Sequence, residues 1–185
     1  MQTLQPMKQL TKIIESLATE EHCLFMLSDL RASLPKLTSG AFKVVMSRAE
    51  KTGLFKRVCR GIYLYPKAGF PRGLLLFHAA ARLRADTFNY MSLETVLSDA
   101  GVISQVPMNW ITLMSSGRSN VIRCGEWGTI EFVHTNQKPE TLKDHLEYDP
   151  RCHLWRASVA VALRDMKKVR RNLDLVDWSV VNEPV

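Results

Sequence analysis

The chain has 185 residues, 46% of them hydrophobic, and a formal net charge of +7 at neutral pH. This length and apolar content suit one domain or two small ones, each with a buried core, better than a large enzyme. No run approaches the ~18 consecutive apolar residues of a membrane span, and the start shows no signal-peptide pattern, so we expect a cytoplasmic protein without a membrane partner.

The first predicted elements are two helices, Leu4–Leu17 and Ser28–Leu34. Ser28 can accept a hydrogen bond from the open N–H groups of the second helix, and Pro35 should end it. The first helix has apolar residues at helical spacing, which predicts a buried stripe. These residues are Leu10, Ile13, Ile14 and Leu17.

A third helix should begin after Thr38 or Ser39 and end at Gly53. Its buried stripe is predicted from the i, i+3, i+4, i+7 spacing of Phe42, Val45, Met46 and Ala49. The outward residues are Gly40, Lys43, Val44, Ser47, Arg48 and Lys51. Such side chains suit a DNA major groove: cations for phosphates or guanines, a hydroxyl, and a small apolar group for a thymine methyl. A solvated surface helix shows the same pattern.

A short basic hairpin is predicted next, with strands in Leu54–Cys59 and Ile62–Tyr65 joined by Arg60-Gly61. Helix, turn, helix and hairpin follow one another in the order of a winged helix-turn-helix. We therefore predict a DNA-binding domain in residues 1–70. Its candidate contacts are Ser39, Lys43, Val44, Ser47, Arg48, Lys51, Lys56, Arg57 and Arg60.

The distribution of charge favours DNA binding over a merely solvated helix. Residues 1–70 hold 11 Lys and Arg against 5 Asp and Glu, whereas residues 71–185 hold 14 against 13. Between Lys36 and Lys67 there are eight basic residues and one acid, Glu50. The positive field therefore coincides with the predicted third helix and hairpin, and we expect an association with the nucleoid.

A Pro- and Gly-containing linker, 66–71, separates this domain from a second one, 71–185. Helices are predicted at 73–84 and 92–100, the latter capped by Ser92 and ended by Gly101. A β-rich region is predicted from Pro107, with strands at 110–114, 120–124 and 129–134 that form a small antiparallel sheet, and a loop-rich segment follows to Pro150. The predicted fold class is α+β, with an N-terminal winged helix-turn-helix and a C-terminal α/β domain whose antiparallel sheet is packed by helices.

The last predicted helix, Cys152–Asn172, has two stripes. The apolar stripe, expected to face the core, is Trp155, Val159, Ala162, Met166, Val169 and Leu173. The basic stripe is Arg164, Lys167, Lys168 and Arg171. Basic residues near a helix C-terminus complement its dipole, which is one explanation; a second surface that binds nucleic acid or a partner is the other.

The sequence shows no established catalytic motif. The polar run Ser115–Ser119 could hold a phosphate or form a solvated turn. Asp144, His145 and Glu147 could be posed as an acid–base set but lie in a predicted loop with nothing to orient them. The four cysteines form no C-x-x-C pair and are expected to be reduced and mostly buried. We therefore predict no enzyme activity, no catalytic residue, no cofactor and no metal site.

Five short segments together resemble one known family. They are Arg60–Tyr63, Tyr90–Leu97, Thr112–Arg118, Gly128–Thr135 and Ala157–Asp165. Their order and spacing resemble the AbiEi antitoxins of abortive-infection type IV toxin–antitoxin systems over nearly the whole chain. Because the chain ends soon after the predicted last helix, we expect a compact family member.

The resemblance implies an antitoxin encoded beside a nucleotidyltransferase-like toxin. Its winged helix would bind inverted repeats in its own promoter and repress the operon, and its second domain would carry antitoxicity, in many cases without a stable complex with the toxin. The DNA-contacting roles then fall on Lys43, Ser47, Arg48 and Lys51 of the third helix and on Lys56, Arg57 and Arg60 of the hairpin. We place antitoxicity on the basic stripe of the last helix.

Two other hypotheses remain. The first is a stand-alone winged-helix transcription regulator whose C-terminal domain senses a ligand or dimerises. The second is a catalytic or RNA-processing protein, which the missing motifs disfavour.

Overall fold

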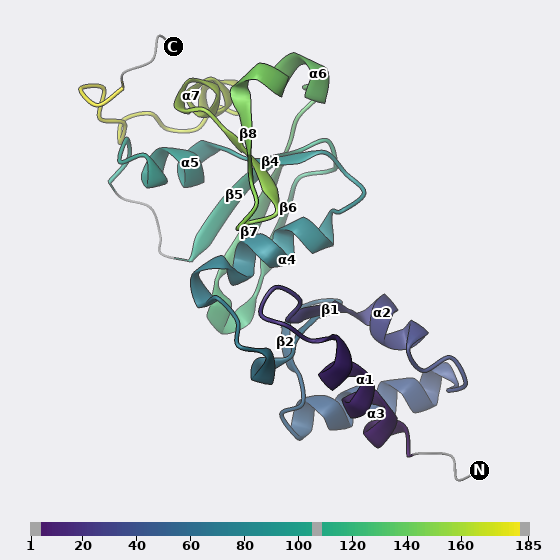
Figure 1. The fold of residues 1–185 in the computed structure, drawn as a ribbon. Helices are drawn as coiled ribbons and strands as arrows, with labels where there is room; N and C mark the ends of the chain where they lie inside the picture. The colour runs from purple at the N-terminus through teal and green to yellow at the C-terminus, as the bar shows by residue number, and fades with distance from the viewer. Residues whose placement is uncertain (1–4, 105–108, 182–185) are drawn as a thin grey trace. The chain divides into compact units, whose positions relative to one another are not determined.

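The computed structural model describes residues 5–104 and 109–181 (Figure 1). Within these residues the chain forms seven α-helices and two β-sheets, so the predicted α+β class is confirmed. The chain divides into two compact units, Met1–Leu75 and Leu76–Val185. Leu4 and Pro107, where a predicted helix and the predicted β-rich region begin, lie outside the described residues.

The N-terminal unit contains three helices and a three-stranded antiparallel sheet of order β1-β3-β2. In chain order its elements are α1 (Pro6–Leu17), β1 (Leu24–Met26), α2 (Leu27–Ala32), α3 (Ser39–Lys51), β2 (Lys56–Cys59), β3 (Ile62–Leu64) and the short 3₁₀ turns η1 (Pro66–Ala68) and η2 (Arg72–Leu74). Strand β1 was not predicted, because three residues carry too little alternation to be recognised.

The start and end of α3 and the turn of the hairpin are as predicted, whereas β2 begins two residues later than predicted and β3 ends one residue earlier. The N–H of Ala41 donates to Oγ1 of Thr38 at 3.2 Å, which caps the start of α3. Gly53 follows the helix with φ +73°, and Gly61 turns the hairpin with φ +85°. Both values lie in the left-handed region that glycine adopts without steric cost.

The predicted capping role of Ser28 is wrong. Helix α2 begins one residue earlier, and the Asp29 carboxylate accepts a hydrogen bond from the N–H of Met26 at 3.3 Å. The Ser28 hydroxyl instead donates to Asp29. For the open N–H groups at the start of α2, the Asp29 carboxylate is a better acceptor than a serine hydroxyl, because its negative charge also lies at the positive end of the helix dipole.

The core of the N-terminal unit is centred on Phe55, whose side chain is 1% exposed. Its ring meets those of Phe25, Tyr63 and Tyr65 edge-on at 6.1–6.4 Å between centroids. The predicted α3 stripe is buried against this cluster. In α1 only Leu10 and Ile14 of the predicted stripe are buried; Ile13 is half-buried and Leu17 is 51% exposed.

The C-terminal unit is built on one six-stranded sheet of order β6-β7-β5-β4-β9-β8. Its elements are α4 (Leu75–Leu83), β4 (Asn89–Met91), α5 (Leu93–Asp99), β5 (Trp110–Ser115), β6 (Asn120–Arg123), η3 (Gly125–Trp127), β7 (Thr129–His134), α6 (Pro139–Leu142), η4 (Lys143–His145), β8 (Leu146–Asp149), β9 (Leu154–Ala157) and α7 (Val159–Lys168). Helix α5 packs against α7 and β5.

The prediction of a small antiparallel sheet is therefore wrong. The sheet is mixed, because β5 pairs with β7 and β4 pairs with β9 in parallel. Strands β5, β6 and β7 lie within one residue of their predicted positions, whereas β4, β8 and β9 were not predicted. Each of those three has only three or four residues.

The predicted helix Cys152–Asn172 is wrong at both ends. Residues 154–157 form β9, where Trp155 is 44% exposed, and α7 starts at Val159. Ser158 caps α7 by accepting from the N–H of Val161 at 3.3 Å. Ser92 precedes α5 but makes no capping bond, since its hydroxyl donates to Asp165 at 2.8 Å.

Among the helices of residues 5–104 and 109–181, none combines the length and apolar content that crossing a bilayer requires.

Candidate nucleic-acid interface

The outer face of α3 is exposed along its whole length. Four residues of α3 are buried: Phe42, Val45, Met46 and Ala49. Their burial fixes the rotation of the helix about its axis, so the residues on the opposite side point to solvent. Val44 is 51% exposed, so its apolar side chain is open to contact. The exposed predicted contacts on this helix are Ser39, Lys43, Val44, Ser47, Arg48 and Lys51.

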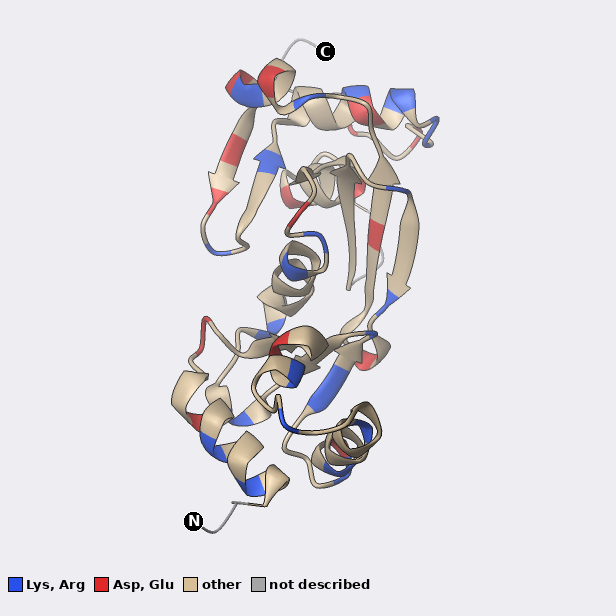
Figure 2. Ribbon diagram, turned by 90° about the vertical axis from the view of Figure 1, so that its right-hand side faces the viewer, with Lys and Arg blue, Asp and Glu red and all other residues tan. Residues whose placement is uncertain are grey.

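The hairpin presents three more basic side chains. Lys56 and Arg57 are both exposed although they are adjacent, whereas Val58 and Cys59 are both buried. A β-bulge between Arg57 and Cys59 accounts for this break in alternation, because the register against β3 shifts there. Arg60 is exposed in the turn. Figure 2 shows Lys and Arg on both α3 and β2.

A hydrogen bond joins α3 to the hairpin. The N–H of Phe55 donates to the carbonyl of Ala49 at 3.2 Å, so the strand begins directly against the last turn of the helix. Lys51, near the end of α3, and Lys56, the first residue of β2, are five residues apart across this junction. The basic residues of helix and hairpin thus belong to one continuous part of the unit.

The cations of α3 are not neutralised within the unit. Over the described ranges, Lys43, Arg48 and Lys51 make no ion pair. Arg48 and Lys51 lie in the last turn, where the helix dipole favours positive charge. Their charge remains available to an external anion such as a phosphate backbone.

A groove of about 510 Å³ lies beside this surface, between α2, α3 and β3. Its lining residues are Leu27, Ser28, Arg31, Ser39, Phe42, Lys43, Met46, Ser47, Glu50 and Tyr63. Burial, and secondarily the negative charge of Glu50, raises the pKa of the Tyr63 hydroxyl. This groove is not predictable from the sequence alone, because Leu27 and Tyr63 belong to segments that reach α3 only through tertiary packing.

The predicted basic stripe of the last helix does not form one continuous helical face. Arg164, Lys167 and Lys168 lie on α7 and are exposed, whereas Arg171 lies beyond its end. The half-buried Arg171 guanidinium forms ion pairs with Glu94 and Glu131. Its charge therefore ties the C-terminal segment to α5 and β7.

A fully buried carboxyl group organises the C-terminal unit. Asp165, 0% exposed, accepts hydrogen bonds from the hydroxyls of Tyr90 (3.0 Å) and Ser92 (2.8 Å). The side-chain amide of Gln137 donates to its other oxygen at 2.8 Å. Burial, and then the neighbouring Asp165, raises the pKa of Tyr90 far above its ordinary value. The signal that could have revealed this network is Asp165 itself, an acidic residue three positions after Ala162 of the predicted apolar stripe.

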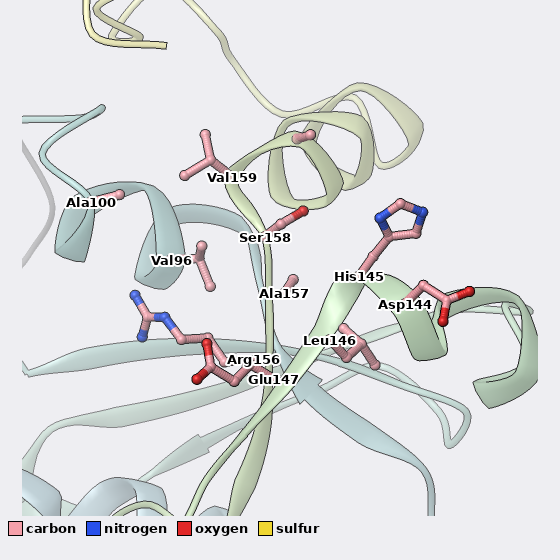
Figure 3. A pocket seen from close by; sticks show the side chains of 11 residues that line it. Val96, Ala100, Asp144, His145, Leu146, Glu147, Arg156, Ala157, Ser158 and Val159 are labelled. Atoms are coloured by element: carbon pink, nitrogen blue, oxygen red, sulfur yellow. The ribbon is translucent and has the colours of Figure 1, made fainter. Parts of the chain in front are cut away.

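A second cavity, of about 590 Å³, lies in the C-terminal unit between α5, η4, β9 and the start of α7 (Figure 3). Asp144, His145 and Glu147 all line it, but Figure 3 shows Asp144 and His145 pointing away from Glu147. Arg156 lies beside Glu147 and donates to Asp99 at 2.9 Å. The three candidate acid–base groups therefore do not converge on one reacting atom.

The polar run Ser115–Ser119 is occupied by contacts inside the unit. Arg84 donates to the Ser115 hydroxyl at 2.7 Å, and its guanidinium lies 4.0 Å from the centroid of the Phe132 ring. The His134 ring and N–H bond to the Gly117 carbonyl and the Ser119 hydroxyl. Burial lowers the pKa of Arg84. The backbone N–H groups of Ser116 and Gly117, which a phosphate would need as donors, already donate to the Phe88 carbonyl and the Ser115 hydroxyl.

All four cysteines are buried, as expected. In the described part of the chain, no group of three or more His, Cys, Asp or Glu side chains is placed to hold a metal ion.

One family model matches residues 12–148, which is most of the chain, and its description is "Family of unknown function (DUF6088)". The matched segment runs from α1 to β8. No curated protein matches the sequence.

Proposed function

The chain belongs to the DUF6088 family, whose function is unknown, and we propose that it is a sequence-specific double-stranded DNA-binding protein that represses transcription. In this proposal the N-terminal unit is a winged helix-turn-helix. The element order α1-β1-α2-α3-β2-β3 supports it, with α3 as the recognition helix and the β2–β3 hairpin as the wing.

The observation that carries the proposal is the row of unpaired cations on α3, directly continuous with the basic hairpin. An α-helix with its side chains is about 10–12 Å wide, which matches the ~12 Å width of the B-DNA major groove. Lys43, Ser47 and Arg48 would then reach base edges or phosphates. Val44 would contact a thymine methyl, which explains an exposed valine in a polar face.

The resemblance to AbiEi antitoxins extends the proposal to an antitoxin of a type IV system. The chain would bind inverted repeats in its own promoter and counteract a nucleotidyltransferase-like toxin through the C-terminal unit, without needing a stable complex. Arg164, Lys167 and Lys168 are the candidate antitoxic residues, and Arg171 supports the fold of that unit through its ion pairs.

A second candidate function is a stand-alone regulator whose C-terminal unit senses a ligand. The cavity of about 590 Å³ favours it, because its volume falls in the usual range of ligand pockets.

DNA binding is tested by fluorescence anisotropy with the duplex upstream of the reading frame and a shuffled duplex of the same composition. The wild-type chain should prefer the natural sequence. The double variant Lys43→Ala/Arg48→Ala should bind it at least about tenfold more weakly, since each lost base contact is worth about 1–3 kcal/mol. The control Lys8→Ala/Lys12→Ala removes the same charge from exposed positions of α1 and should keep the preference.

Equal affinity for the two duplexes, or equal binding by both double variants, would reject sequence-specific recognition by α3. The proposed antitoxin activity is tested in a growth assay. Cells that express the neighbouring nucleotidyltransferase-like toxin gene should resume growth when this chain is co-expressed, and the Lys43→Ala/Arg48→Ala variant should restore growth equally well. Absence of such a gene, or of rescue, would leave the regulator as the better description.

A further inference from the structure

The groove between α2 and α3 has an apolar floor and an exposed apolar lip. Phe42, Met46 and Tyr63 are each at most 6% exposed and form the floor. Leu27 at the start of α2 is 37% exposed. An apolar side chain beside an open apolar groove is the kind of surface that proteins cover with a partner.

Two opposite charges on α3, seven residues apart, stand on the groove; the third charged lining residue, Arg31, donates to the carbonyls of Leu34 and Leu37. Lys43 and Glu50 both line it, and two helical turns separate them by about 10 Å along the axis. Neither forms an ion pair within the residues that the structure describes. The midpoint between them falls at Met46 and Ser47, which also line the groove.

This arrangement is self-complementary under a twofold axis. When a second α3 lies antiparallel across the groove with its midpoint on Met46 and Ser47, each Lys43 faces the Glu50 of the other copy. A twofold interface requires such pairing of one patch with itself. We propose that the occupant of the groove is a second copy of this chain, with the two Leu27 side chains covering the apolar floors.

Self-association would hide part of the DNA-binding surface, a consequence that rests on the proposed function. Ser39, Lys43 and Ser47 belong both to the groove and to the candidate DNA contacts. One molecule could then engage either the duplex or its copy through α3. The dimer would be unable to bind DNA through α3, and its population would rise with protein concentration.

The two equilibria should respond to salt in opposite directions. DNA binding weakens with salt because counterions are released from the phosphates. The net positive charges of two N-terminal units repel each other over longer distances than the Lys43–Glu50 contacts span, and salt screens this long-range repulsion more than it screens the short contacts. The dimer should therefore tighten as salt is raised.

The test is sedimentation equilibrium of the full chain, without DNA, from micromolar to millimolar concentration. Lys43→Glu and Glu50→Lys should each weaken the dimer at least about tenfold, because both symmetric contacts become like-charge pairs. The double variant Lys43→Glu/Glu50→Lys restores opposite charges and should return the dissociation constant to within about threefold of wild type. Lys12→Glu and Glu15→Lys, exposed on α1, make the same changes of charge and should have no effect.

A wild-type chain that stays monomeric throughout would overturn the proposal and leave the groove to a helix of another protein. A dimer unchanged by either single substitution would place the interface elsewhere, and failure of the double variant to restore it would reject the antiparallel register. Because no DNA is present, these outcomes are independent of the anisotropy measurements. A dimer without DNA binding would reject only the proposed function, and DNA binding without a dimer only this inference.

Discussion

The salt dependence of DNA binding follows quantitatively from the exposed charges. Six basic side chains on α3 and the hairpin are exposed: Lys43, Arg48, Lys51, Lys56, Arg57 and Arg60. If each neutralises one phosphate, log K should fall against log salt with a slope of about −5. Raising salt from about 50 to about 200 mM should then cost roughly a thousandfold in affinity.

The double variant Lys51→Ala/Arg60→Ala removes one contact from the helix and one from the hairpin, so the slope should become shallower by about 2. The same rise in salt should then cost only roughly a hundredfold. Anisotropy titrations of a labelled duplex at several KCl concentrations measure the slope directly.

Lys138→Ala/Lys143→Ala is the matched control, because it removes two exposed charges from the C-terminal unit. If the slope is set by direct contacts with phosphates and not by the net charge of the whole protein, this control variant should have the wild-type slope. An equal reduction by both variants, or a wild-type slope shallower than about −2, would refute the assignment of these six residues to phosphate contacts.

Three further predictions concern stability and reactivity. Gly128→Ala should prevent stable folding in a thermal melt, since φ is +122° and the added Cβ would lie 2.0 Å from the Asn109 carbonyl oxygen; Gly73→Ala, which meets nothing within 4 Å, should melt like wild type. Asp165→Ala should cost about 3 kcal/mol or more in urea unfolding because it leaves buried donors without an acceptor, and Asp165→Asn should cost less because its amide oxygen still accepts; equal losses would contradict this. Burial raises the pKa of the Cys152 thiol from 9.0 to about 12, so its contribution to stability should be complete below pH 9 and fall as pH rises toward 12; rapid alkylation of folded Cys152 at pH 8 would show that the thiol is accessible and ionised.

The sequence predicted α3 and its hairpin because their determinants are local. Thr38 caps the helix, Gly53 ends it, and Arg60-Gly61 closes the hairpin, all within a few residues of the elements that they define. The exposed face followed from helical periodicity alone. The groove beside this face could not be predicted in the same way, because Leu27 and Tyr63 reach α3 only through tertiary packing.

The C-terminal sheet was poorly predicted because its pairings are long-range. Strand β4 joins two neighbours that come later in the chain, and its parallel partner β9 pairs Tyr90 with Trp155. The three- and four-residue strands show no clear alternation of their own. The apolar residues of β9 and α7 share a helical spacing across Ser158. For this reason the sequence predicts one helix from Cys152, where the structure has a strand followed by a helix.

The order in which these strands are synthesised has a consequence for the nascent chain. The sheet of the N-terminal unit is complete when Leu64 has left the ribosome, so that unit can fold early. The centre of the second sheet must wait for residues 154–157, and until then one edge of β4 has no neighbour. During synthesis the second unit therefore passes through a stage with unpaired strand edges, which chaperones and proteases can recognise. A chain whose synthesis stops at this stage would have a folded first unit joined to an incompletely folded second unit.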